Sequence, residues 1–95
     1  NCQKMDFGIF IQTERKKKGL PLRKVAANLD IDTSTLSKIE RGDRQASIEH
    51  LPMFAEIFEI DLRNIEAEYI YSVIKNQLGK LQNLKEGLQT TITRL

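Results

Sequence analysis

The stretch of residues 20–42 constrains the fold most, because it contains two short segments with helical apolar spacing that are only three residues apart. The apolar positions are Val25, Ala26 and Leu29 in the first segment and Leu36 and Ile39 in the second. Pro21 suits a first helical turn, Asp32 is placed to cap the second helix, and Gly42 suits its left-handed end. The stretch therefore predicts a short helix, a tight turn, and a second helix over residues 33–41.

The rest of the chain also has helical spacing, without the alternation typical of a strand and without an internal repeat. A helix is expected over residues 7–18, ending at Gly19. Ser47 and Asp61 are expected to cap two further helices. The residues expected to face the core are Ile48, Leu51, Phe54, Ala55 and Phe58 in the first of these helices and Leu62, Ile65 and Tyr69 in the second. The predicted fold class is all-α.

The C-terminal segment keeps apolar residues at spacings of three and four over residues 70–95. Gly79 and Gly87 each weaken a helix by roughly 1 kcal/mol relative to alanine, so a free-standing coiled coil is not expected. Two alternatives are open. The segment pairs with its twin in a dimer, or it folds back on the domain with Ile9 and Phe10 as its contact.

Length and composition limit the classes of protein. Ninety-five residues, 40% apolar and 29% charged, suit one small helical domain. No apolar run approaches the roughly 20 residues that span a bilayer, and no secretion signal is evident, so a cytoplasmic protein without a membrane partner is expected. The single cysteine, Cys2, cannot form an internal disulfide, and His50 has no partners at metal-ligand spacing.

Residue patterns that support catalysis are missing from the sequence. Paired carboxylates, a nucleophile with a histidine base, and a phosphate-binding glycine loop are all absent. We therefore expect no enzyme activity, no cofactor, no metal and no small-molecule ligand.

Positive charge is concentrated in the first half of the chain. Residues 1–46 hold ten Lys or Arg against six Asp or Glu, whereas residues 47–95 hold five against seven. This imbalance alone is more typical of a solvated surface than of a nucleic-acid site. The run from Arg15 to Lys18 ends a predicted helix, where basic residues also stabilise the helix dipole, so phosphate contact and simple solvation are both open for its lysines.

The predicted helix over residues 33–41 begins with small polar side chains, which suit insertion into the major groove of DNA. Candidate base contacts lie on one face as i, i+4 pairs, Thr33 with Ser37 and Ser34 with Lys38. Candidate phosphate contacts in and after this helix are Thr35, Arg41 and Arg44. The alternative interpretation is an ordinary solvated helix face.

A wider set of residues between Gly19 and Leu51 forms a recognisable pattern. Its members are Gly19, Leu20, Val25, Ala26, Leu29, Ile31, Ser34, Leu36, Ser37, Ile39, Glu40, Arg41, Gly42, Ser47, Ile48 and Leu51. The pattern resembles the Cro and phage-repressor (XRE) helix-turn-helix family over roughly residues 7–65. Parts of it are also similar to small regulators that accompany bacterial restriction-modification genes.

The resemblance implies a compact five-helix, lambda-repressor-like domain that binds a double-stranded DNA operator as a homodimer. We expect residues 1–66 to form this DNA-binding domain. From the apolar spacing of the tail, we expect residues 67–95 to form a helical C-terminal extension that serves dimerisation. The family also pairs an arginine of the first helix with a glutamate near the end of the third, here Arg15 with Glu40. Removing one partner of such a buried pair typically costs about 3 to 5 kcal/mol, so these two residues are expected to be structural.

The chain departs from the family pattern at three positions. Leu22 stands where many members carry a phosphate-binding Gln, so Arg23 or the amides of that helix are expected to take over the contact. Asp30 stands where Gly is usual, although Asp tolerates left-handed backbone better than most residues. Ala46 replaces a common Pro.

Together these residues predict a sequence-specific double-stranded-DNA-binding transcription regulator that reads the major groove with residues 33–41. The alternative class is a protein-interaction or antitoxin-type adaptor in which the C-terminal helix holds a partner. Affinity for random duplex that collapses at physiological salt, with no sequence selected above it, would favour the adaptor.

Overall fold

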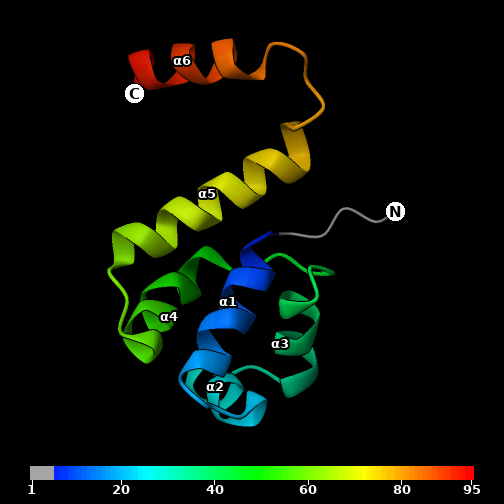
Figure 1. Cartoon of the computed structure of the whole chain (residues 1–95), viewed down its shortest axis with the longest axis vertical. Coiled ribbons are helices and arrows are strands. Elements are labelled where there is room, and N and C mark those ends of the chain that lie inside the picture. The colour runs from blue at the N-terminus through cyan, green and yellow to red at the C-terminus, as the bar shows by residue number, and fades with distance from the viewer. Residues whose placement is uncertain (1–5) are drawn as a thin grey trace.

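This computed structural model describes residues 6–95, and the regular elements in this part of the chain are all helices. They are α1 (Asp6–Lys17), α2 (Leu22–Leu29), α3 (Thr33–Glu40), the 3₁₀ helix η1 (Ile48–His50), α4 (Leu51–Phe58), α5 (Leu62–Leu78) and α6 (Leu84–Arg94). The all-α prediction is confirmed over these residues, whereas Cys2 lies outside them. Figure 1 shows α1 to α4 grouped together, α5 crossing one side of the group, and α6 standing beyond the end of α5.

Positive φ angles mark the ends of the first four α-helices. They are 68° at Gly19, 59° at Asp30, 82° at Gly42 and 58° at Glu59. After α2, the left-handed Asp30 lets the Ile31 backbone N–H donate to the Ala26 carbonyl oxygen at 3.0 Å, which closes the end of the helix. Asp30 therefore performs the turn for which the family usually employs glycine.

Aromatic side chains form the centre of the core. Phe7 of α1 packs edge-on against Phe54 and Tyr69, with ring centroids 6.0 and 5.1 Å apart, and Phe54 stacks on Phe58 at 5.9 Å. The other buried apolar residues are Ile11, Val25, Ala26, Leu29, Leu36, Ile39, Ala46, Leu51, Ala55 and Ile65. Each of the α-helices α1 to α5 contributes to this core, whereas η1 and α6 have no buried residue.

Helices α1 and α3 cross at very close range. A Cβ atom added to Gly8 would lie 2.8 Å from the Glu40 carbonyl oxygen and still closer to that of Ile39. Only a residue without a side chain fits between the two backbones at this point. The main chain of α1 therefore fixes the position of the C-terminal part of α3.

Polar contacts tie α5 to the rest of the domain. The Phe7 backbone N–H donates to Ser72 Oγ at 3.0 Å, which satisfies a donor in the first turn of α1 that has no partner within its own helix. The Tyr69 hydroxyl donates to the Ala46 carbonyl oxygen at 2.6 Å and accepts from Gln45 Nε2 at 3.0 Å. The predicted domain boundary between residues 66 and 67 falls inside α5, and the packed domain continues past it to Ser72.

Two of the residues expected to face the core lie on the surface. Ile48 is 69% exposed and Leu62 is 37% exposed. Residues 48–50 form η1 rather than the first turn of α4, and the tighter 3₁₀ turn places Ile48 outside the inner stripe of the following helix. Leu62 begins α5, and the inner face of that helix is set further along, at Ile65, Tyr69 and Ser72.

The predicted helix caps are only partly correct. Asp61 accepts a hydrogen bond from the Arg63 backbone N–H at 2.9 Å and caps α5 as expected, and Ser47 caps η1. The Asp32 side chain caps nothing, contrary to the prediction. The Asp32 carbonyl oxygen instead accepts from the Leu36 backbone N–H at 3.1 Å, so the main chain begins α3 without the carboxylate.

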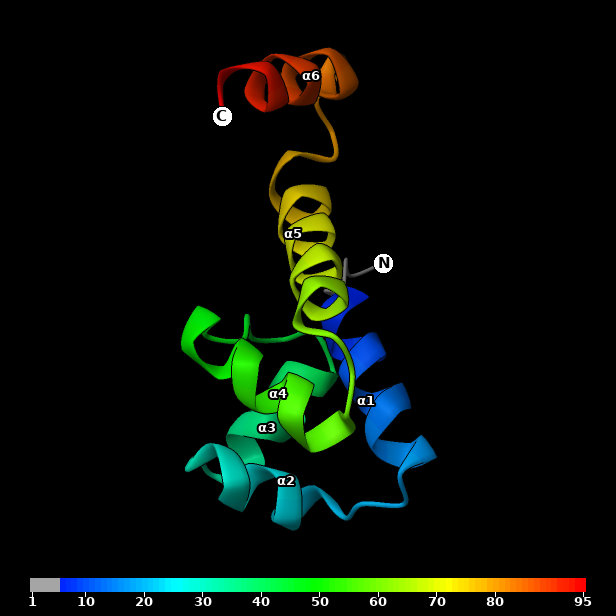
Figure 2. The ribbon, with the colours of Figure 1, turned by 90° about the vertical axis from the view of Figure 1, so that its left-hand side faces the viewer.

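Contacts with the domain decrease along the C-terminal part of the chain. Lys75 of α5 still reaches Asp6 of α1, with Nζ 2.9 Å from Oδ2, before α5 ends at Leu78. Residues 79–83 then lead into α6, which has no buried residue. Figures 1 and 2 show α6 lying across the far end of α5, away from α1 to α4. Ile9 stays 55% exposed, so the tail of the same chain does not cover it.

None of the helices in residues 6–95 has the length and apolar character needed to cross a bilayer.

Candidate DNA-binding surface

Helix α3 has one face in the core and one face on the surface. Leu36, Ile39 and Glu40 are buried. The four candidate base contacts lie on the other side of the helix, with Thr33, Ser34 and Lys38 exposed and Ser37 half-buried. The first two turns of α3 therefore present hydroxyl groups and one ammonium group, with no carboxylate among them.

The ion pair between Arg15 and Glu40 joins α1 to the end of α3. Arg15 Nε and Nη2 donate to the two carboxylate oxygens of Glu40 at 2.7 and 3.0 Å, and Nη1 donates to the Leu20 carbonyl oxygen at 2.9 Å. Only 13% of the Arg15 side chain and 3% of the Glu40 side chain is exposed. The hydrogen bonds that Arg15 donates to Glu40 raise the pKa of Arg15 above its ordinary value. All three guanidinium nitrogens of Arg15 donate hydrogen bonds within the domain, so Arg15 has a structural role.

Arg41, a candidate phosphate contact, is already held by neighbouring side chains. Its Nε donates to Asp43 Oδ2 at 3.1 Å, and its Nη1 donates to Ser37 Oγ at 2.8 Å. The structure thus brings together two candidate site residues, Ser37 and Arg41. Asp43 was not among the sequence candidates, and its only signal was its position two residues after an arginine at the end of α3. Its carboxylate occupies Arg41 in this structure.

The remaining candidate phosphate contacts lie in α3 and in the segments on either side of it. Arg23 of α2 and Arg44 after α3 are exposed, and Thr35 is half-buried within α3. Within residues 6–95, neither arginine forms an ion pair, and neither does Lys38. These three cations therefore have no carboxylate to give up before they bind an anion.

Two lysines of the basic run at the end of α1 are used inside the protein. Lys17 Nζ lies 3.3 Å from Glu14 Oε2, and Lys18 Nζ lies 2.6 Å from Glu59 Oε1. The hydrogen bond from Lys18 lowers the pKa of Glu59. These pairs favour the interpretation of the run as a solvated helix end.

His50 lies in η1, next to the core. Across residues 6–95, no group of His, Cys, Asp and Glu side chains is arranged to hold a metal ion.

Comparison with known proteins fits this geometry. Residues 11–65, more than half of the chain, match a family model described as helix-turn-helix. The chain belongs to the helix-turn-helix family. The matched range contains α2 and α3, the turn between them, and both partners of the Arg15–Glu40 ion pair.

A solved structure supports the same assignment. The clp gene regulator ClgR from C. glutamicum is similar to this helix-turn-helix protein, with a TM-score of 0.60 and 25% sequence identity, over 72% of this chain and 88% of that chain. None of the curated proteins matches. The predicted XRE-type family is confirmed, while the similarity to restriction-modification regulators stays a prediction.

Proposed function

We propose that this helix-turn-helix protein is a transcription regulator that binds a specific double-stranded DNA sequence as a homodimer and reads it with α3. The observation that carries the proposal is the exposed polar face at the start of α3, on a helix whose opposite face is fixed in the core. A recognition helix has to present slim hydrogen-bonding side chains at a defined place, and α3 meets both conditions.

The roles of the base-contacting residues follow from their chemistry. Lys38 is the only cation on the exposed face of α3, and lysine suits the O6 and N7 acceptors of guanine. Thr33, Ser34 and Ser37 carry hydroxyl groups that both donate and accept, so they suit several base edges. Lys38 is therefore the residue that sets preference at one base pair, and the hydroxyl groups adjust the fit around it.

The phosphate contacts position the protein without reading sequence. Arg44 and Arg23 bind directly, and Thr35 adds a hydroxyl contact. Arg41 exchanges Asp43 for a phosphate oxygen when DNA arrives, because its pair with Asp43 is half exposed and easily replaced. This exchange makes Arg41 a weaker contributor than Arg44.

The similar ClgR protein is by its title a regulator of clp genes. Since it aligns with most of this chain at a TM-score of 0.60, it supports a regulatory role for the shared fold. The DNA sequence that this chain recognises depends on its own α3 side chains, and the similarity to ClgR does not indicate that sequence.

Selection of bound duplexes from a random library tests the proposal. We expect an enriched sequence with two-fold symmetry, whose half-sites lie about one helical turn, roughly 34 Å, apart or a multiple of it. Lys38→Ala should relax the preference at one base pair in each half-site, whereas Arg44→Ala should weaken all duplexes alike and reduce the salt dependence. Lys80→Ala, in the linker before α6, is the matched control and should change neither property.

Binding without any enriched sequence would contradict the proposal. If the affinity for random duplex also vanished between low and physiological salt, the adaptor function would replace it.

A further inference from the structure

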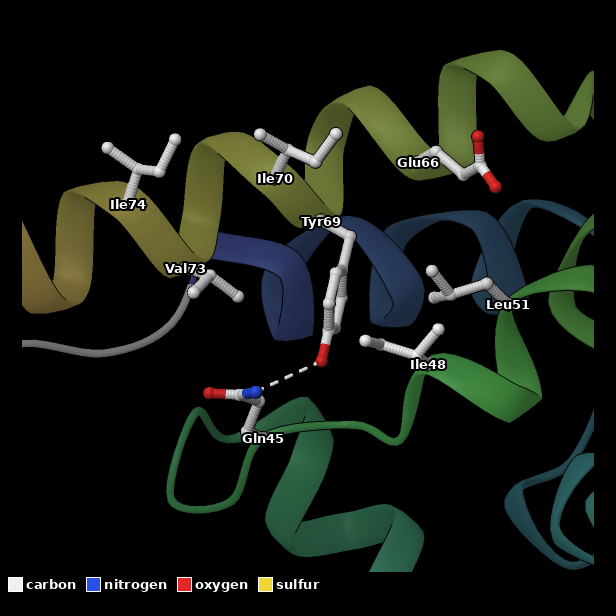
Figure 3. Close-up of a pocket in the computed structure, with 8 residues that line it drawn as sticks. All are labelled: Gln45, Ile48, Leu51, Glu66, Tyr69, Ile70, Val73 and Ile74. Carbon is white, nitrogen blue, oxygen red and sulfur yellow. Dashed lines mark hydrogen bonds between the residues drawn. The ribbon is translucent and has the colours of Figure 1, made fainter. Parts of the chain in front are cut away.

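An apolar groove lies on the side of α5 that faces η1. Its volume is 450 Å³, and its apolar walls include Ile48, Tyr69, Ile70, Val73 and Ile74. Figure 3 shows Tyr69 and Val73 extending from α5 toward the segment after α3, with Ile48 beside the Tyr69 ring and Ile70 and Ile74 along α5. Ile70 is 56% exposed in the single chain, and Ile48 more so. Contiguous exposed apolar surface of this kind is typical of an interaction site.

Helix α6 has a matching apolar surface that the rest of the chain leaves at least partly exposed. Leu84, Leu88 and Ile92 recur at spacings of four, so they form one stripe along the helix, and Leu95 follows directly after the end of the helix. None of the residues of α6 is buried, and Ile92 is 67% exposed. An isolated helix of eleven residues is marginal in water, so α6 needs a surface on which to place this stripe.

The groove and the stripe match in length and are complementary in charge. The groove follows α5 from Glu66 to Ile74, and the stripe within α6 runs from Leu84 to Ile92, so each extends about 12 Å at 1.5 Å per residue. Glu66 is the charged residue in the groove wall, and α6 carries Lys85 and Arg94 against one acid. The net positive charge of α6 is therefore complementary to the carboxylate at the rim of the groove.

We propose that the groove of each protomer receives α6 of a second copy, so that the homodimer forms by reciprocal exchange of C-terminal helices. This deepens the homodimer part of the proposed function, and DNA is not needed for it. The α6 of the same chain lies across the far end of α5, whereas the groove lies beside its middle and η1 (Figures 1 and 3). A two-fold exchange covers both grooves and both stripes in one closed assembly.

The exchange connects dimerisation with the recognition helix. Gln45, which also lines the groove, follows α3 by five residues and donates to the Tyr69 hydroxyl. A helix seated in the groove thus rests on the segment that leads out of α3. The partner's α6 helps to set the relative position of the two reading helices.

Sedimentation equilibrium of the full chain without DNA tests the exchange. Ile70→Asp places a charge in the groove and Leu88→Asp places one in the stripe, and each should weaken dimerisation by roughly 30-fold or more. Leu62→Asp is the matched control on the same helix as Ile70, outside the groove, and should leave the dimer intact. Circular dichroism of each variant establishes that the helical content is retained.

Mixing the two defective variants distinguishes exchange from the other arrangements. In a heterodimer, the intact groove of Leu88→Asp receives the intact α6 of Ile70→Asp, so the mixture should dimerise more tightly than either variant alone. No recovery in the mixture would mean that α6 folds back on its own chain. A dimer that tolerates Leu88→Asp would mean that α5 pairs with α5. A wild-type monomer at high micromolar concentration would also overturn the proposal, leaving the groove to another occupant.

The two proposals fail separately. A wild-type dimer that follows the exchange pattern but enriches no DNA sequence would remove the regulator function and leave the exchange in place.

Discussion

Replacing Arg15 by methionine tests how α3 is anchored. The substitution keeps an unbranched side chain but removes three hydrogen bonds, two to Glu40 and one to the Leu20 carbonyl oxygen. It leaves a carboxylate with 3% of its surface exposed and no counter-ion. Leaving a buried charge unpaired typically costs about 3 to 5 kcal/mol. In a domain of this size that loss corresponds to a drop in Tm of at least about 12 °C.

The partner substitution should be milder. In Glu40→Met the unpaired group is Arg15, which keeps its bond to the Leu20 carbonyl oxygen and is more exposed than Glu40. The double variant removes both charges, so its loss should be smaller than the sum of the single losses by about 2 to 3 kcal/mol. Thermal and urea unfolding followed by circular dichroism measure all three values.

An exposed pair serves as the control for this cycle. Lys18→Met breaks the ion pair with Glu59 at the surface, and it should change the Tm little. Losses that add up in the double variant would show that Arg15 and Glu40 act independently, and they would refute the anchoring role of the pair. The hydrogen bonds to Glu40 raise the pKa of Arg15 above its ordinary value, so the guanidinium keeps its charge at neutral pH, and its contribution is lost only as the pH rises through the raised pKa. The cycle can therefore be run at neutral pH.

Three further substitutions test other contacts. Gly8→Ala should lower the unfolding free energy by about 1 to 3 kcal/mol in urea titrations, because its Cβ meets the α3 backbone, and a variant as stable as wild type would contradict the close crossing. The pKa of Asp61 is lowered by hydrogen bonds from Arg63, so its stabilisation is present above the ordinary pKa of 3.8 and is lost as pH falls through the lowered value. Asp61→Asn keeps a capping oxygen and should therefore reduce the loss of Tm at acidic pH in calorimetry. Asp43→Asn should tighten DNA binding severalfold in a low-salt anisotropy titration, because Arg41 is released for phosphate, and unchanged affinity would exclude this competition.

The helices could be predicted from the sequence because their signals are local. Apolar spacing identifies the inner faces of α2 and α3, and residues such as Gly19 and Gly42 carry the left-handed turns that end helices. The same apolar spacing gave a wrong prediction at η1. The spacing of α4 extends back to Ile48, but the 3₁₀ turn places that residue outside the buried stripe of α4.

Contacts between distant segments could not be predicted from spacing. Ser72 on α5 looks like an ordinary helical serine, yet it accepts a hydrogen bond from Phe7, 65 residues earlier. Pairing of Arg15 with Glu40 was expected from the family resemblance alone, since no spacing rule connects residues 25 apart. The pairing of Asp43 with Arg41 could not be predicted from the sequence, because it depends on the conformation of the Arg41 side chain.

The close crossing of Gly8 with α3 has a consequence for which residues of α3 can change. Because the main chain of α1 and the inner side chains of α3 fix that helix, its outward residues carry little responsibility for folding. Thr33, Ser34 and Lys38 can therefore be exchanged for other polar residues at small cost in stability, so under the proposed function a few substitutions at exposed positions would redirect the protein to a new DNA sequence.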